Sequence, residues 1–327
     1  MALITPFDDF PIHQTAETLA VPSSSDRNHY DRYWFNGFSE EKDFLFEIGV
    51  GFYPNRHIMD AHFSISTAGK QYSYHASTRM NPARYPINIG PISLEILEPM
   101  QKIRFSLKDP EKKLSCDLIF NGITEPHLEP KSLMIEGTRK ILETSRFTQF
   151  GKWDGSIETE SGNLDLTKEY GTRDKSWGVR PVGEPEIGAP GKLNAEPGVY
   201  WCWIPINFGD TFTHFGTFED HDGNSTQLSA DLVEISNNEV IKPLNNISHK
   251  VDWIKGTRWS SGAQISAQEG DKKIEINAKA CGPRFHCKGI GYQHPEWGHG
   301  FWKGEEAVGY EVWDLNEINP EDYSFFH

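Results

Sequence analysis

Asp60 and His62 are the first residues of this 327-residue sequence whose types and spacing suit acid–base chemistry. Both lie in the segment FYPNRHIMDAHF, whose second half alternates apolar and polar residues. Residues i and i+2 of a β-strand point to the same side, so the two side chains can share a pocket. An imidazole beside a carboxylate is a general acid–base pair that works near neutral pH. A strand that simply turns its polar side to solvent would show the same pattern, and this alternative stays open.

A second candidate pair, Arg173 and Asp174, lies in the segment GTRDKSWGVR. Neighbouring arginine and aspartate side chains can form charge-assisted hydrogen bonds, which hold a carboxylate ionised or position an acid. The structural alternative is a salt-bridged corner that closes the end of a barrel. From the two segments we predict a catalytic set of four residues: Asp60, His62, Asp174 and Arg173.

Aromatic residues are concentrated in the segments VYWCWIPINF and HPEWGHGFWKGEEAVGYEVW. Buried aromatic side chains at alternating positions usually belong to a core. They can also line the cavity of a β-barrel, where their π faces stabilise a passing carbocation. For this second case we predict the following substrate contacts: Tyr53, Trp177, Tyr200, Trp201, Trp203, His214, Glu306 and Tyr310.

A hydrophobic period of two predicts the elements that must position these residues. It is clearest in segments 44–52, 58–67, 102–108 and 273–280, with turn-forming residues between such segments. We find no stretch with the 3.6-residue period of an amphipathic helix. The sequence therefore predicts an all-β protein with about fifteen or more strands, which is enough for two barrels or sandwiches.

A long segment rich in glycine and proline, residues 181–198, is the best candidate for a domain boundary. Loops of this length in compact proteins are usually functional or lie between domains. We predict an N-terminal barrel over residues 1–180 and a C-terminal barrel over residues 190–327.

The charge and motif content exclude several classes of function. Lys plus Arg is 32 and Asp plus Glu is 47, a net charge of −15, which argues against nucleic acids and anionic membranes as partners. No apolar run is long enough for a membrane-spanning helix, and no secretory signal is recognisable at the N-terminus. Four cysteines without a CxxC motif fit reduced thiols in the cytoplasm. Motifs with the spacing of metal ligands or nucleotide-binding loops are absent from the sequence, and a metal site assembled from distant strands stays open.

Three segments in order, YPNRHIMDAHFS, RFTQFGKWDGSIE and YGTRDKSWGVRP, resemble the superfamily of AttH and carotenoid 1,2-hydratase (hydroxyneurosporene synthase). The similarity spans roughly residues 33–315 and is closest to a bacterial branch. It implies two lipocalin-like β-barrels packed together, with an apolar ligand at or near the domain interface and chemistry that needs no cofactor. The hydratases of this superfamily use an acidic residue as proton donor and aromatic neighbours to steady a cation. Asp60 and Asp174 lie in the matching motifs, and Glu306 is a weaker candidate.

These observations predict a cofactor-independent hydratase or dehydratase, isomerase or cyclase. Its substrate would be a hydrophobic isoprenoid, terpenoid or steroid-like molecule, with a base such as His62 completing the proton transfer. One alternative is a non-catalytic lipocalin-like protein that binds an apolar metabolite. Another is a carbohydrate-active enzyme, which would need two carboxylates about 5–10 Å apart in an open groove. A homo-oligomer also stays open.

Overall fold

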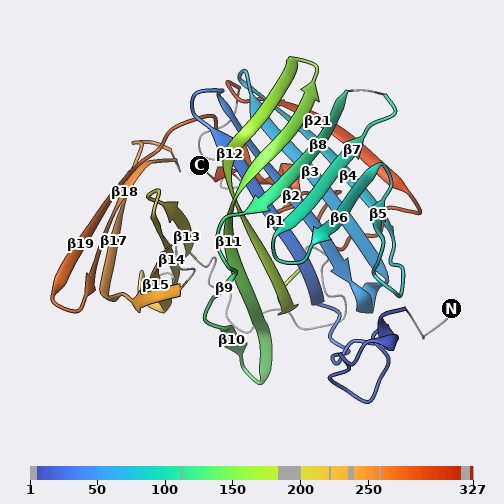
Figure 1. Ribbon diagram of the computed structural model, residues 1–327, viewed down its shortest axis with the longest axis horizontal. Coiled ribbons are helices and arrows are strands. Elements are labelled where there is room, and N and C mark those ends of the chain that lie inside the picture. Colours follow the sequence, from blue (N-terminus) through green and yellow to red (C-terminus); the bar gives the residue numbers. More distant parts are fainter. Residues whose placement is uncertain are drawn as a thin grey trace.

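A computed structural model confirms that the chain folds almost entirely into β-strands (Figure 1). In the part of the chain that the structure describes, the helices are three short 3-10 turns: Pro6–Asp9, Pro54–Arg56 and Cys287–Ile290. The described residues are 6–111, 113–182, 200–220, 222–234, 239–257, 259–317 and 325–326.

A 13-stranded antiparallel sheet is the main element and curls into a half-barrel (Figure 1). Its strand order is β21-β4-β3-β2-β1-β12-β11-β8-β7-β6-β5, with β9 and β10 also paired to β11. The strands are β1 (His29–Ser39), β2 (Phe44–Tyr53), β3 (Ile58–Thr67), β4 (Lys70–Arg79), β5 (Ile87–Ile89), β6 (Ile92–Glu98), β7 (Lys102–Lys108), β8 (Leu114–Gly122), β9 (His127–Leu128), β10 (Ser132–Glu136), β11 (Arg139–Thr159), β12 (Gly162–Val179) and β21 (Ala307–Asp314).

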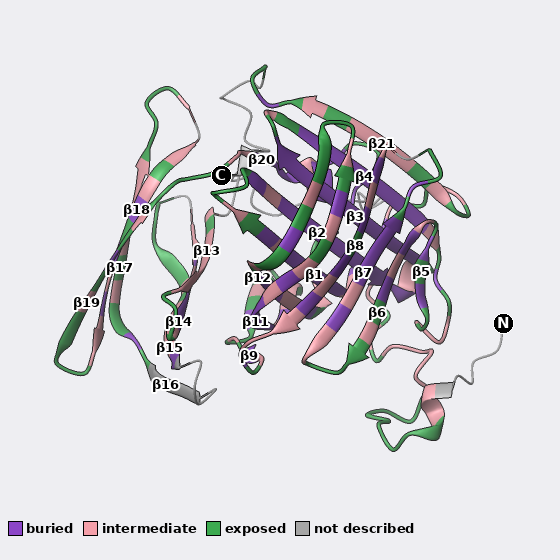
Figure 2. Cartoon of the chain, turned by 45° about the horizontal axis from the view of Figure 1, so that its top comes forward, coloured by how far each residue is buried: buried purple, intermediate pink, exposed green. Residues whose placement is uncertain are grey.

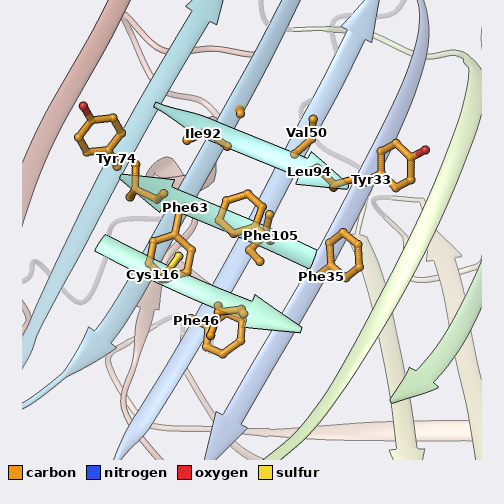
Figure 3. Packing of buried hydrophobic residues seen from close by; sticks show 14 of the residues in the cluster. Tyr33, Phe35, Phe46, Val50, Phe63, Tyr74, Ile92, Leu94, Phe105 and Cys116 are labelled. Atoms are coloured by element: carbon orange, nitrogen blue, oxygen red, sulfur yellow. The ribbon is translucent and has the colours of Figure 1, made fainter. Parts of the chain in front are cut away.

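The hydrophobic core fills the inside of this curl. Figure 3 shows Phe35, Phe46 and Phe63 from β1–β3 packed beneath Phe105 of β7. The side chains come from alternate positions because successive residues of a strand point to opposite faces. The predicted strands over 44–52, 58–67 and 102–108 are thereby confirmed.

The second half of the chain forms two smaller sheets beside β11 and β12 (Figure 1). Their facing sides bury a second, smaller core that includes Phe215, Ile265 and Ile276. The first sheet contains β13 (Tyr200–Asn207), β14 (Thr211–Glu219), β15 (Ser225–Glu234) and β16 (Glu239–Pro243), and the second contains β17 (Asn245–Trp253), β18 (Ser260–Glu269) and β19 (Lys272–Lys279). Two short strands, β20 (Phe285–His286) and β22 (Phe325–Phe326), pair with each other.

The predicted division into residues 1–180 and 190–327 stays a prediction. Most of the glycine- and proline-rich segment that motivated it lies outside the described residues, namely 183–198 of 181–198. The structure adds that β21, from the C-terminal half, pairs with β4 at the edge of the large sheet. Across the described ranges, no helix has both the length and the apolarity needed to cross a membrane.

Candidate functional site

Strand register gathers Asp60, His62 and Asp174 on one face of the large sheet, opposite the core. Asp174 on β12 and His62 on β3 belong to the same cross-strand row, with Trp34 and Gly49 between them. Three strand spacings of about 4.8 Å separate β12 from β3, or roughly 14 Å. Asp174 is therefore too far away to contact Asp60 or His62, although all three share this polar face and the Arg32 guanidinium interacts electrostatically with both carboxylates.

The polar face of the sheet is buried where it crosses β2–β4 (Figure 2). The alternating pattern left open that these polar side chains face solvent, and for these strands that alternative is wrong. Segment 285–302 covers this face, and the backbone of this segment satisfies the polar side chains. The Gln71 Nε2 group donates to the His286 carbonyl at 2.8 Å, and the His286 N–H donates to Gln71 Oε1 at 2.6 Å. Gly289 lies so close to Ser64 that a Cβ there would come within 2.4 Å of its Oγ.

Asp60 and His62 lie beneath this cover and are 2% and 1% exposed. Both oxygens of the Asp60 carboxylate accept hydrogen bonds, one from the Tyr53 hydroxyl at 3.3 Å and one from the Gly300 N–H at 2.7 Å. His62 Nε2 is 3.8 Å from Asp60 Oδ1. The carboxylate thus ties segment 285–302 to the sheet, and its hydrogen bonds leave little freedom to meet a substrate.

His75, His294 and Glu311 bring three potential metal-ligand atoms within 4.8 Å of one another. The tautomer of His294 disfavours the binding of a metal ion at these three residues. Its Nδ1 accepts hydrogen bonds from the backbone N–H groups of residues 296 and 297 at 3.0 and 2.8 Å. The proton of the neutral ring is therefore on Nε2, which donates to Glu311 Oε2 at 2.9 Å and has no lone pair for a metal.

His75 extends this arrangement into a chain of closely spaced ionisable groups, in which His62–His75 and His294–Glu311 are the hydrogen-bonded links. Its Nε2 lies 3.3 Å from Glu311 Oε2, and its Nδ1 lies 2.8 Å from the Nδ1 of His62. The chain runs Asp60, His62, His75, Glu311, His294 across β3, β4 and β21. Burial lowers the pKa of His62 and of His75, so the folded state favours the neutral form of these two imidazoles.

Acid pH should therefore weaken the fold through its buried histidines. Burial lowers the pKa of His75 from 6.5 to about 4, and burial lowers that of His214 to about 4 as well. At pH values between 4 and 6.5 the unfolded chain binds more protons than the folded chain. The free energy of unfolding should therefore have its full value above pH 6.5 and fall as the pH is lowered towards 4. We expect urea unfolding at steps from pH 7 to pH 4 to show this slope, and His75→Gln to make it shallower. An identical slope in the variant would contradict the assignment.

Asp174 lies at the junction between β12 and the β13–β14 sheet. Its carboxyl is surrounded by protein but keeps a narrow contact with the surface, and no side chain of the described ranges forms a hydrogen bond with it. Burial raises the pKa of Asp174 to about 6, against the opposing attraction of the Arg146 guanidinium. The site thus contains an acid that is partly protonated near neutral pH.

Glu129 lies close to several side chains of the junction, and it was not predicted from the sequence. It accepts a hydrogen bond from Trp203 Nε1 at 3.1 Å and another from the Thr148 hydroxyl. Its carboxylate also lies 3.2 Å from His214 Nε2 and 3.6 Å from Arg146. His214 is 1% exposed, and its pKa of about 4 keeps it neutral, so its lone pair can receive a proton.

Aromatic rings close the junction. The Trp34 ring meets the Trp203 ring edge-on at 5.5 Å, which joins β1 to β13. The Arg146 guanidinium lies over the rings of Trp201 and Trp203, 5.2 and 5.8 Å from their centres. A hollow lined by Glu129, Arg146, Trp201, Trp203 and His214 lies on the β13–β14 side of the junction, and its volume is about 10 Å³, the room that one water molecule needs.

Trp34 also holds a second buried acid that sequence analysis missed. Its indole Nε1 donates to Glu47 Oε2 at 3.1 Å, and burial raises the pKa of Glu47 to about 7. Glu47 and Trp34 come from segments whose apolar pattern predicts only core, so nothing in their spacing singles them out. Arg146, by contrast, begins the motif RFTQFGKWDGSIE.

Arg173 does not pair with Asp174, because neighbours on a strand point to opposite faces. Its Nε donates to Gln149 Oε1 at 2.6 Å, and its guanidinium lies 5.2 Å from the centre of the Phe147 ring. The predicted charge-assisted pair is therefore wrong. Arg173 and Asp174 lie within β12, several residues before its end at Val179, so the alternative of a salt-bridged corner at these two residues is wrong too.

The remaining predicted contacts are spread over the molecule. Trp177 is on the Arg173 face of β12, 6.4 Å from Phe147. Tyr200 stacks on His249 in the smaller sheets, Tyr310 packs against the core of the large sheet, and Glu306 is exposed. Of the predicted residues, the junction unites four: Asp174, Trp201, Trp203 and His214.

Comparison with known proteins places the chain in a family. A family model described as "Family of unknown function (DUF8625)" matches residues 4–327. The chain belongs to this family. A search of curated proteins finds no match.

Two crystal structures show that this family member has the AttH-like fold. A candidate AttH (NE1406) from Nitrosomonas europaea is 13% identical with a TM-score of 0.55, and the similarity covers 88% of this chain and 89% of that one. Kievitone hydratase from Nectria haematococca is 12% identical with a TM-score of 0.53, covering 89% and 91%. The predicted resemblance to AttH is confirmed at the level of fold.

Proposed function

We propose that this protein is a cofactor-independent enzyme that transfers protons at the junction, as a hydratase or dehydratase, an isomerase or a cyclase. The substrate class is hydrophobic, of isoprenoid, terpenoid or steroid-like type. The supporting observation is Asp174, because a carboxyl with a pKa of about 6 can hold a proton near neutral pH and donate it. The shared fold with a hydratase supports the reaction class.

In the proposed hydration, the Asp174 carboxyl gives its proton to one alkene carbon and a C–H bond forms. The cation left on the other carbon lies against the indole faces of Trp34 and Trp203. Water forms the new C–O bond, and its surplus proton passes to the neutral imidazole of His214, which Glu129 orients. Return of that proton to Asp174 restores the enzyme, and dehydration runs the same steps in reverse.

Asp174 is favoured over Asp60 because the Asp60 carboxylate is already engaged by two hydrogen bonds under segment 285–302. Isomerisation or cyclisation needs the same acid, with the cation losing a different proton or closing a ring. Since the junction holds about one water molecule, substrate must part β13–β14 from β11–β12 to enter.

An isotope experiment tests the proposal without a known substrate. Hydrophobic extracts would be incubated with the protein in heavy-oxygen water or in deuterated water and compared by mass spectrometry. A hydratase makes a compound that gains one heavy-oxygen water, and an isomerase or cyclase makes an isomer that gains deuterium. Asp174→Asn should abolish either signal, and Asp165→Asn, an exposed change on the same strand, should not. Stoichiometric retention of a compound with neither change would identify a binding protein instead.

A further inference from the structure

A second cavity, here called the mouth pocket, lies at one end of the half-barrel. Its volume is about 240 Å³, and it is partly open to solvent. Phe52, Ile87 and Ile96 extend the hydrophobic core into its wall, and the N-terminal segment closes it with Phe7 and Leu19. It is much larger than the junction hollow and contains no residue of the proposed catalytic set.

The mouth pocket contains two cations and one carboxylate. Lys175 is paired with Asp31, and its ammonium group lies 4.5 Å from the centre of the Tyr33 ring. Arg84 also lines the pocket. Its Nε is buried without a hydrogen-bond partner, and no side chain within the described ranges bonds its guanidinium.

The surroundings of Arg84 leave its charge incompletely balanced. Burial lowers the pKa of Arg84, and Asp31, already paired with Lys175, offsets this only partly. His29 faces the same group, and burial lowers its pKa, which favours the neutral imidazole and avoids a second positive charge beside Arg84. A half-buried guanidinium whose Nε has no partner is poorly satisfied, whereas one that binds a carboxylate is well satisfied.

We propose that the mouth pocket binds a small carboxylate with an apolar body, either aromatic or short-chain aliphatic. The carboxylate would meet the Arg84 guanidinium, which matches it with two parallel hydrogen bonds. The apolar body would lie against Phe52, Ile87 and Ile96. The volume is somewhat below that of pockets for drug-sized molecules and therefore selects a small ligand.

This site is independent of the proposed catalytic junction. Asp174 and Lys175 are neighbours on β12, and their side chains point to opposite faces of the sheet. Failure of the mouth-pocket proposal would leave the role of Asp174 untouched, and the reverse also holds.

Matched ligands test the proposal directly. Benzoate and hexanoate would be compared with the neutral benzyl alcohol and hexanol by ligand-observed NMR and calorimetry. The wild-type protein should bind each acid at least about 10-fold more tightly than its alcohol, as expected when a charge-assisted pair forms. Arg84→Gln should weaken the acids about 10-fold or more and leave the alcohols unchanged.

Two further variants keep the result interpretable. Arg104→Gln removes an exposed arginine of β7 that pairs with Asp117, and should bind the acids as the wild type does. Ile96→Trp fills the pocket and should abolish binding of acids and alcohols alike, with near-ultraviolet circular dichroism showing that each variant is folded. Absence of acid binding to the wild type up to about 10 mM, equal affinity for acids and alcohols, or full binding by folded Arg84→Gln would overturn the proposal.

Discussion

Replacing Asp174 by asparagine is expected to lower turnover by about 10²–10⁴-fold, the usual contribution of a general acid. Asparagine keeps the shape of the side chain but cannot donate a proton as a carboxylic acid does. Its amide is also neutral, so the penalty for burying a charge at this position disappears.

Stability separates this effect from damage to the fold. Because the folded-state pKa of Asp174 lies above the ordinary 3.8, the free energy of unfolding falls as the pH rises from 3.8 to about 6. At higher pH the folded state bears the full cost of the buried charge. We therefore expect Asp174→Asn to unfold at no lower urea concentration than the wild type at pH 8, although it is inactive. Loss of activity together with loss of stability, or full activity, would contradict the role of Asp174. Asp165→Asn provides the control for a change of charge on β12.

The largest expected effect on stability is that of Trp153→Ala. Trp153 is fully buried at the centre of the large sheet, with the rings of Phe35, Phe46 and Phe120 at 5.2–5.7 Å, and its indole N–H donates to the Asn36 carbonyl at 2.7 Å. Truncation removes these contacts and leaves a cavity, so the free energy of unfolding should fall by about 3–5 kcal/mol.

Urea unfolding monitored by circular dichroism measures this loss. Trp253→Ala is the matched control, because Trp253 is 53% exposed on β17 and its removal should change the free energy of unfolding by less than about 0.5 kcal/mol. Similar losses in both variants would show that the core inside the half-barrel does not dominate the stability of the chain.

The strands with one apolar face were predictable from the sequence, because alternation is a local property. β3 is an example, with Met59 and Phe63 in the core and Asp60 and His62 opposite. The long hairpin of β11 and β12 was not predicted, since polar side chains occur on both of its faces. Arg173 is buried on one face, where Gln149 and aromatic rings satisfy it, and Asp174 lies on the other.

The membership of the clusters could not be predicted, because strand register brings distant residues together. His75 meets His62 and Glu311 only because β4 pairs with β3 on one side and β21 on the other. Glu129 joins the junction from the connection after β9, where no periodic pattern indicates the direction of a side chain. The motif segments pointed to Asp174. Its burial, which raises its pKa, and its distance from Arg146, which opposes that rise, depend on tertiary packing.

The most direct test of the proton-donor role is a titration of the Asp174 carboxyl carbon by NMR. The protein would be labelled with ¹³C at its aspartate side chains, and the signal of Asp174 assigned by its absence from Asp174→Asn. We predict a pKa of about 6 for this carboxyl. A pKa close to the ordinary 3.8 would mean that Asp174 is fully ionised near neutral pH, and the proposed proton donation would be wrong.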